Sequence, residues 1–179
     1  MIFKETKIKG AYLIDLEKNE DERGFFARSF CLQEFKEHGI DFNIAQCNIS
    51  FNKKKGTLRG MHYQSTPFEE AKLVSCIKGR IYDVIIDLRR DSATYCQWLA
   101  LELREQDYRI LYVPKGFAHG FQTLAPDTVV LYQMSEFYYP ESARGIRWND
   151  PAFLIDWPSD NQIISVKDKA YPLFNKNIL

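Results

Sequence analysis

The sequence predicts an all-β fold, in which short antiparallel strands form a barrel or sandwich with a few short helices. Segments that alternate apolar and polar residues recur along the 179 residues, separated by Gly, Pro, Asn and Asp. Aromatic residues make up 15% of the chain, a high share for a helical bundle and one that suits strands. Helical periodicity is scarce, and no glycine-rich phosphate loop follows a strand, so a parallel βαβ fold is excluded.

Ten strands follow from this pattern. They cover residues 11–16, 25–30, 44–50, 57–64, 71–78, 80–88, 97–103, 109–113, 120–124 and 128–135. Residues 32–38, which precede Gly39, predict one short helix, and a turn or two is expected around Gln106 and near the C-terminus. Strands of this length and spacing are typical of sandwiches and barrels. Because no repeat or linker interrupts them, we expect a single domain over residues 1–179.

The charge composition argues against polyanionic partners. The chain has 24 basic and 24 acidic residues and a formal net charge of zero, whereas a nucleic-acid binder normally shows a basic excess. Any anion that it binds must therefore be held by a few cations placed around it. We expect no nucleic-acid partner.

The start of the chain and its cysteines indicate the cellular compartment of the protein. The first residues lack the apolar run of a signal peptide, and no apolar stretch approaches the roughly 20 residues of a membrane helix. We therefore expect a cytoplasmic protein with no membrane attachment. The four cysteines are widely spaced, which predicts reduced thiols, mostly buried, rather than a disulfide framework.

Three polar residues interrupt predicted strands. Arg59 and His62 both lie in segment 57–64, three positions apart, and would face opposite sides of a regular strand unless Gly60 introduces a bulge. Lys72 lies among apolar residues, where an ammonium group is unusual. Taken singly, each has a bland explanation: a surface arginine, a hydrogen-bonded core histidine and a lysine that extends to the rim.

A second group of polar and aromatic residues follows. Residues 113–121 place His119 in a Gly/Pro-containing turn flanked by aromatics, which predicts a loop that closes over the mouth of a cavity. Tyr132 lies in an otherwise apolar strand, and Tyr138 in an aromatic run. Core packing and backbone contacts explain each of them singly. Together with the three strand residues they indicate a small-molecule site that contains an acid, a base and cations.

The histidine pattern argues against a metal centre. Barrels that bind iron, manganese or zinc often use a His-x-His pair on one strand, but the residue two before His62 is Gly60. The three histidines of the chain, His38, His62 and His119, are scattered. We expect no catalytic metal and no cofactor.

Eight motifs then run in order along nearly the whole chain. They are Asp21–Phe26, Gln46–Ser50, Leu58–Gln64, Lys72–Val74, Asp83–Arg89, Val113–Phe121, Gly145–Pro151 and Ser165–Asp168. In this order they resemble the dTDP-4-dehydrorhamnose 3,5-epimerases and related nucleotide-sugar epimerases. The resemblance implies a cupin-like jelly-roll that works without metal. It also implies a homodimer in which N-terminal strands pair with the sheet of the partner.

The resemblance assigns catalytic roles. The implied substrate is a nucleoside-diphosphate 4-keto-6-deoxyhexose, most simply the dTDP sugar, whose C3 and C5 hydrogens are acidified by the C4 carbonyl. By this resemblance His62 is the base and Asp168 its partner. Tyr132 matches the acid that returns a proton to the opposite face, and Lys72 matches the group that faces the C4 oxygen and stabilises the enolate.

The resemblance also assigns substrate contacts. Arg23 and Arg59 match the groups that hold the diphosphate, for which the planar guanidinium is suited. The remaining expected contacts are Arg28, Gln46, Asn48, His119, Tyr138 and Lys167. Arg28 and Ala143 stand where the family pattern has glutamates near the nucleotide, and Glu141 lies two residues from the second of them. The nucleotide base, thymine, cytosine or guanine, is therefore left open.

Four alternatives remain at this point. The chain could epimerise a single centre, or move the keto group as related ketoisomerases do. A non-catalytic sugar-binding cupin would tolerate loss of the acid or the base, yet His62, Lys72, Tyr132 and Asp168 are all present. A metal-dependent cupin oxygenase would require stoichiometric iron or zinc.

Overall fold

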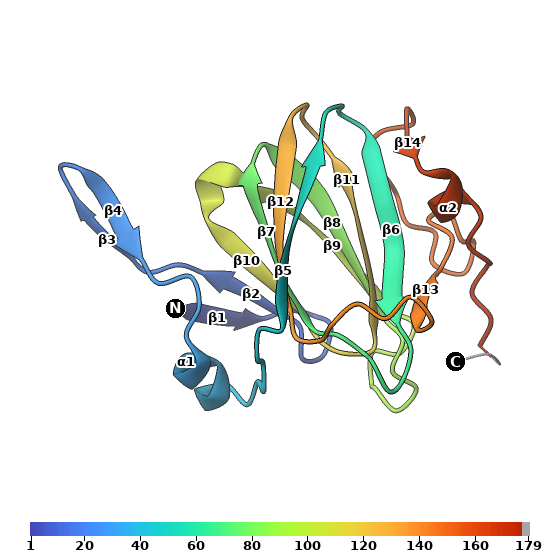
Figure 1. Ribbon diagram of the computed structural model, residues 1–179, viewed down its shortest axis with the longest axis horizontal. Helices are drawn as coiled ribbons and strands as arrows, with labels where there is room; N and C mark the ends of the chain where they lie inside the picture. The colour runs from blue at the N-terminus through green and yellow to red at the C-terminus, as the bar shows by residue number, and fades with distance from the viewer. Residues whose placement is uncertain (177–179) are drawn as a thin grey trace.

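Two β-sheets face each other in this protein (Figure 1). The computed structural model describes residues 1–176. The first sheet has the order β1-β2-β10-β7-β12-β5. Its strands are β1 (Ile2–Glu5), β2 (Tyr12–Asp15), β10 (Arg109–Val113), β7 (Lys72–Lys78), β12 (Thr128–Met134) and β5 (Gln46–Asn52). All of its pairings are antiparallel.

The second sheet has the order β13-β6-β11-β8-β9, with β14 added parallel to β6. Its strands are β13 (Ala143–Gly145), β6 (Thr57–Gln64), β11 (Phe117–Thr123), β8 (Arg80–Asp87), β9 (Trp98–Arg104) and β14 (Ile163–Ile164). The helices are short: α1 (Leu32–Glu37), α2 (Val166–Lys169) and a single 3₁₀ turn at Glu105–Asp107. This architecture confirms the predicted all-β fold.

The main core lies between the two sheets because every second residue of their strands points inward. Val74 and Val130 of the first sheet pack with Ile85 and Phe121 of the second. α1 covers the outer face of the first sheet through Phe35. Residues 146–157 cover the outer face of the second sheet.

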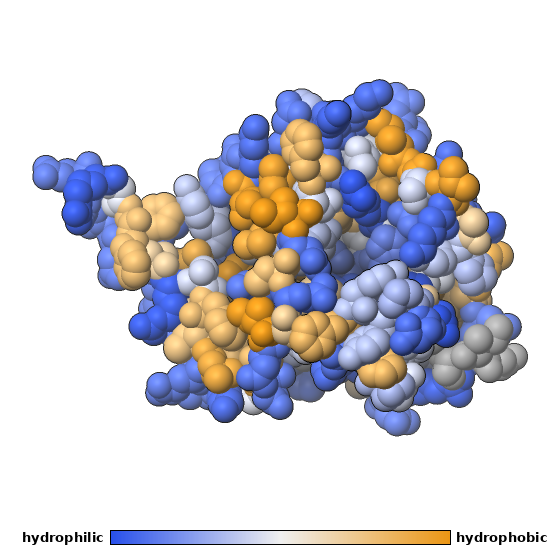
Figure 2. Space-filling model, in the orientation of Figure 1, coloured by the Kyte–Doolittle hydropathy of each residue, from blue (hydrophilic) through white to orange (hydrophobic). Residues whose placement is uncertain are grey.

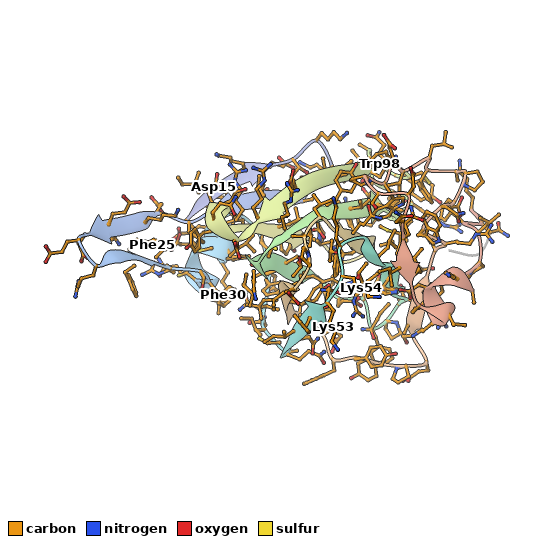
Figure 3. All side chains as sticks on the ribbon, turned by 90° about the horizontal axis from the view of Figure 1, so that it is seen from above. Asp15, Phe25, Phe30, Lys53, Lys54 and Trp98 are labelled. Carbon is orange, nitrogen blue, oxygen red and sulfur yellow. The ribbon has the colours of Figure 1, made fainter. Side chains whose placement is uncertain are left out.

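A hairpin of β3 (Lys18–Asp21) and β4 (Gly24–Ala27) lies outside both sheets. It projects from the body in the view of Figure 1 and also in Figure 3, which labels Phe25 on it. It contacts the body at Tyr108, whose ring lies under the Lys18 ammonium and edge-on to the ring of Phe25. Phe26 is 76% exposed.

A bulge in β6 brings Arg59 and His62 to the same face. His62 pairs with His119, whereas Arg59 pairs with Phe121, so β6 has one more residue than β11 over this stretch. The bulge depends on Gly60, whose φ is +143°, a backbone conformation that L side chains rarely adopt. The predicted effect of Gly60 is confirmed.

The strand predictions overlap the observed strands throughout, and residues 57–64 and 109–113 have the predicted bounds. β1, β3, β13 and β14 were not predicted because they are short and, in β3, wholly polar. The prediction of a loop at His119 was wrong. The turn ends at Gly116, and β11 begins at Phe117 because Phe117, His119 and Phe121 alternate inward as in any strand.

The prediction for the cysteines was partly wrong. All four thiols are free, but only Cys76 is buried, and Cys47 is exposed on the edge strand β5. No helix among residues 1–176 is long and apolar enough to cross a membrane.

Candidate active site

A cavity of about 610 Å³ opens between the two sheets, beside β5 and β6. Figure 2 shows the surface hollowed in this region, with mainly hydrophilic residues around the hollow. Ten of the residues singled out in the sequence line it: Gln46, Asn48, Arg59, His62, Lys72, His119, Tyr132, Tyr138, Lys167 and Asp168. They come from five strands, from α2 and from the segment after β12.

His62 is held by a carboxylate from the C-terminal segment. Its Nε2 lies 2.8 Å from Oδ1 of Asp168, which is buried in α2. The hydroxyl of Ser165 accepts from the Asp168 N–H and so caps this short helix. Burial by itself would raise the pKa of the Asp168 carboxyl, but the hydrogen bonds from His62 and Gly60 bring it below its usual range. Asp168 is therefore ionised at neutral pH and fixes the orientation of the imidazole.

Tyr132 enters the cavity from the opposite sheet. It lies on β12, and its ring centroid is 6.0 Å from that of His119 on β11. Burial raises the pKa of its hydroxyl strongly, and the nearby Asp83 raises it further. The hydroxyl therefore keeps its proton at neutral pH and can serve as a donor.

His119 has a buried acidic partner that the sequence reasoning missed. Its Nε2 lies 2.7 Å from Oδ1 of Asp83, and both side chains are almost fully buried. Among the described residues, Oδ2 of Asp83 has no hydrogen-bond partner. The signal was present, since Asp83 is a carboxylate in the middle of the apolar segment 80–88.

Lys72 is buried, not extended to the rim. Its ammonium is 3.1 Å from Oε1 of Glu70, and the two side chains are each 6% exposed. It also donates to the backbone oxygen of His62 at 3.4 Å. The carboxylate offsets the cost of burying the ammonium. Glu70, likewise missed, lies two residues before Lys72, a spacing that places both on one side of an extended chain.

The other cations differ in their surroundings. Nε of Arg59 donates to Oδ1 of Asn52 at 2.8 Å, which fixes the guanidinium at the cavity wall. Lys167 is exposed at the mouth, where Tyr171 and Tyr138 raise the pKa of its ammonium. Tyr171 was not predicted, and its ring stands edge-on to His62. The wall thus offers positive charge to an anion that enters between the sheets.

Arg23 and Arg28 do not reach this cavity within one chain. Arg23 lies at the tip of the projecting hairpin, where it pairs with Asp21 at 2.6 Å. Arg28 pairs with Glu34 at 2.7 Å and lines a separate cavity of about 200 Å³ beside the N-terminus. Ala143, the other position that departs from the family pattern, does line the main cavity.

Residues 5–176 match the sequence profile of the family described as dTDP-4-dehydrorhamnose 3,5-epimerase. The chain belongs to this epimerase family. Among its relatives is the dTDP-4-dehydrorhamnose 3,5-epimerase of Sinorhizobium fredii, which is 40% identical over 96% of this chain and 89% of the relative.

Solved structures of the family agree closely with the fold. The epimerase of Bacillus anthracis, with TDP and PPi bound, superposes with a TM-score of 0.93 at 40% identity, covering 97% of this chain and 99% of that one. An epimerase from Legionella pneumophila, in complex with dTDP-4-keto-L-rhamnose, has a TM-score of 0.90 at 38% identity and covers 99% and 94%. The family's cupin-like fold, which the motifs implied, is thereby confirmed.

The described residues contain no group of three or more His, Cys, Asp and Glu side chains arranged to hold a metal ion. His62 and His119, the two histidines of the cavity, are each bonded to their own aspartate. The chemistry that these side chains offer is proton transfer and charge stabilisation.

Proposed function

We propose that this chain epimerises a dTDP-4-keto-6-deoxyhexose at C3 and C5, through an enolate, as the dTDP-4-dehydrorhamnose 3,5-epimerases do. One observation carries the proposal. The His62–Asp168 pair and the protonated Tyr132 come from opposite sheets and line one cavity. Inversion of a carbon centre requires a base on one face of the ring and an acid on the other.

The first step is removal of a proton next to the ketone. With Nε2 bonded to Asp168, Nδ1 of the neutral His62 ring is the nitrogen that takes the proton. The electrons of the C–H bond form a carbon–carbon double bond, and those of the C4 carbonyl move to its oxygen. The Lys72 ammonium faces that oxygen and stabilises its negative charge, an effect worth about 3 kcal/mol for one such donor.

The second step returns a proton to the other face. Tyr132 donates its hydroxyl proton to the same carbon as the enolate collapses to the ketone. The phenolate then regains a proton from solvent and the imidazolium loses one, so the enzyme returns to its starting state. The raised pKa of Tyr132 makes the phenol the resting form.

Substrate binding uses the remaining cations and a second subunit. Arg59 and Lys167 hold the diphosphate from within the chain, and Gln46, Asn48, His119 and Tyr138 contact the substrate. We infer a homodimer in which the hairpin inserts into the partner and brings Arg23 and Arg28 to its site. The exposed Phe26 and the apolar side chains of Ile49, Phe51 and Ile77 support this assembly. Figure 2 shows the apolar patch over β5 and β12.

The proposal is tested by hydrogen exchange in deuterated water. The protein is incubated with dTDP-, CDP- and GDP-4-keto-6-deoxyhexoses, and the labelled carbons are read by NMR. We expect label at C3 and C5 of the dTDP sugar and none with His62→Ala. Label at one centre would indicate a mono-epimerase, and a displaced keto group a ketoisomerase. No exchange with any sugar would contradict the proposal.

Tyr132→Phe separates the two steps. The variant keeps the base, so we expect deuterium to enter the sugar with retained configuration, while inversion falls roughly 10²- to 10⁴-fold. The configuration of the labelled product measures this. If inversion continues at the wild-type rate, Tyr132 is not the acid.

A further inference from the structure

Glu70 lines the cavity beside Lys72 and has no role in the mechanism above. Oε1 of its carboxylate binds the Lys72 ammonium. Oε2 is buried and has no hydrogen-bond partner among the described residues. A buried carboxylate oxygen without a donor is costly. A bound molecule that offers a hydroxyl would remove this cost.

Lys72 has one donor left for the same molecule. An ammonium carries three N–H groups, and two are directed at Oε1 of Glu70 and the backbone oxygen of His62. The third is free for a ligand atom. One free donor and one free acceptor thus belong to two side chains that are joined by an ion pair and line the same cavity.

A carbonyl next to a hydroxyl-bearing carbon matches this pair. The carbonyl oxygen accepts from Lys72, and the hydroxyl donates to Glu70. In a 4-keto-6-deoxyhexose only one neighbour of C4 carries a hydroxyl: C3 does, whereas C5 carries the methyl group. We therefore propose that Glu70 is a specificity-determining residue whose Oε2 accepts a hydrogen bond from the C3 hydroxyl of the substrate.

This inference rests on the proposed function, because it takes the C4 oxygen to lie at Lys72. It adds an orientation to that function. The C3 side of the ring lies against Glu70, and the C5 side with its methyl group lies away from the carboxylate. It also explains how a negative charge is tolerated beside an oxyanion site: the carboxylate is shared between the ammonium and the hydroxyl.

The test compares the natural sugar with its 3-deoxy analogue, in wild-type protein and in Glu70 variants. Exchange at C5 is measured, because both sugars keep that hydrogen. We expect the wild-type protein to prefer the natural sugar by roughly 10- to 100-fold in kcat/KM, the range for a hydrogen bond to a charged group. In Glu70→Met we expect this preference to fall to near the difference in reactivity that the two sugars have without a contact to residue 70.

Glu70→Gln and Glu69→Gln complete the design. The glutamine at position 70 keeps an oxygen for Lys72, so this variant still folds and carries the test if the methionine variant fails to fold. In Glu70→Gln we expect the preference for the natural sugar to fall below about tenfold. Glu69 does not line the cavity, and its variant keeps the wild-type preference. An unchanged preference in Glu70→Met or Glu70→Gln overturns the inference. Absence of exchange by the wild-type protein with both sugars overturns the proposed function itself, and this inference with it.

Discussion

The His62 ring owes its orientation to a carboxylate that lies 106 residues later in the chain. Asp168 is buried, capped by Ser165 and ionised despite its burial. An imidazole held in this way presents the same nitrogen to every substrate molecule and is stabilised when it takes up the proton. A single carboxyl group therefore links folding and catalysis in this protein.

Replacement of Asp168 by Asn tests that link. Because the folded pKa lies below the ordinary value of 3.8, the carboxylate stabilises the fold fully above that pH and loses its contribution as the pH falls through the folded pKa. We expect the variant to be less stable than wild type at pH 7. The difference should vanish at the acid end of a series of urea denaturations.

The same variant should exchange substrate hydrogen roughly 10²- to 10⁴-fold more slowly, because the amide cannot stabilise the imidazolium. Asp160→Asn is the control, since Asp160 is exposed and does not line the cavity. A stability difference that is constant with pH would show that the carboxyl does not titrate as described.

At the scale of elements, two glycines decide where β6 presents its side chains. Gly60 in β6 and Gly120 in β11 face each other so closely that a Cβ on Gly60 would lie 2.5 Å from Cα of Gly120. Because neither glycine has a side chain, the two backbones approach closely enough to form the bulge. The bulge turns both Arg59 and His62 toward the cavity. The geometry of the base thus depends on the neighbouring strand.

Gly120→Ala tests the contact. The added Cβ would lie 2.8 Å from the backbone oxygen of Arg59 and 3.0 Å from Cα of Gly60, and backbone atoms cannot move aside cheaply. We expect a loss of about 1–3 kcal/mol in the free energy of unfolding and a lower exchange rate. Gly39→Ala is the control: its φ is +71°, but no atom lies within 4 Å, so exchange should be unaffected. Wild-type exchange in Gly120→Ala would show that the bulge is not needed.

At the scale of the whole molecule, the projecting hairpin is the element on which the proposed dimer depends. Phe26 is 76% exposed, and Arg23 lies at the tip of the hairpin, outside the chain's own cavity. Exposed apolar side chains of this size indicate an interface. In a two-fold dimer each hairpin would serve the other subunit.

Mixing two inactive variants tests the shared site. Arg23→Ala lacks the hairpin cation, and His62→Ala lacks the base. After the two are unfolded and refolded together, half of the dimers are mixed and hold one intact site of two, so about a quarter of the wild-type activity should return. Each variant refolded alone is the control. No recovery from protein shown to contain mixed dimers would place Arg23 at its own chain's site or outside any site.

Much of this protein is determined by local sequence. Alternation and turn residues predict the strands because the direction of a side chain in a strand depends only on its position. The motifs identify the family, and the bulge at Gly60 follows from its neighbours. By contrast, β13 and β14 are too short to show a pattern, and they form because the edge of β6 that does not pair with β11 is left for them.

The tertiary structure alone decided which side chains meet. Local pattern could not pair His119 with Asp83, which lies 36 residues away, nor place Tyr132 across the cavity from His62. The first relation arises when β8 and β11 pair within one sheet and bury polar groups that then need partners, and the second arises when the two sheets pack face to face. Arg23 is a second case in which sequence does not determine position. Its motif predicts that it contacts the substrate, but within one chain it lies outside the cavity.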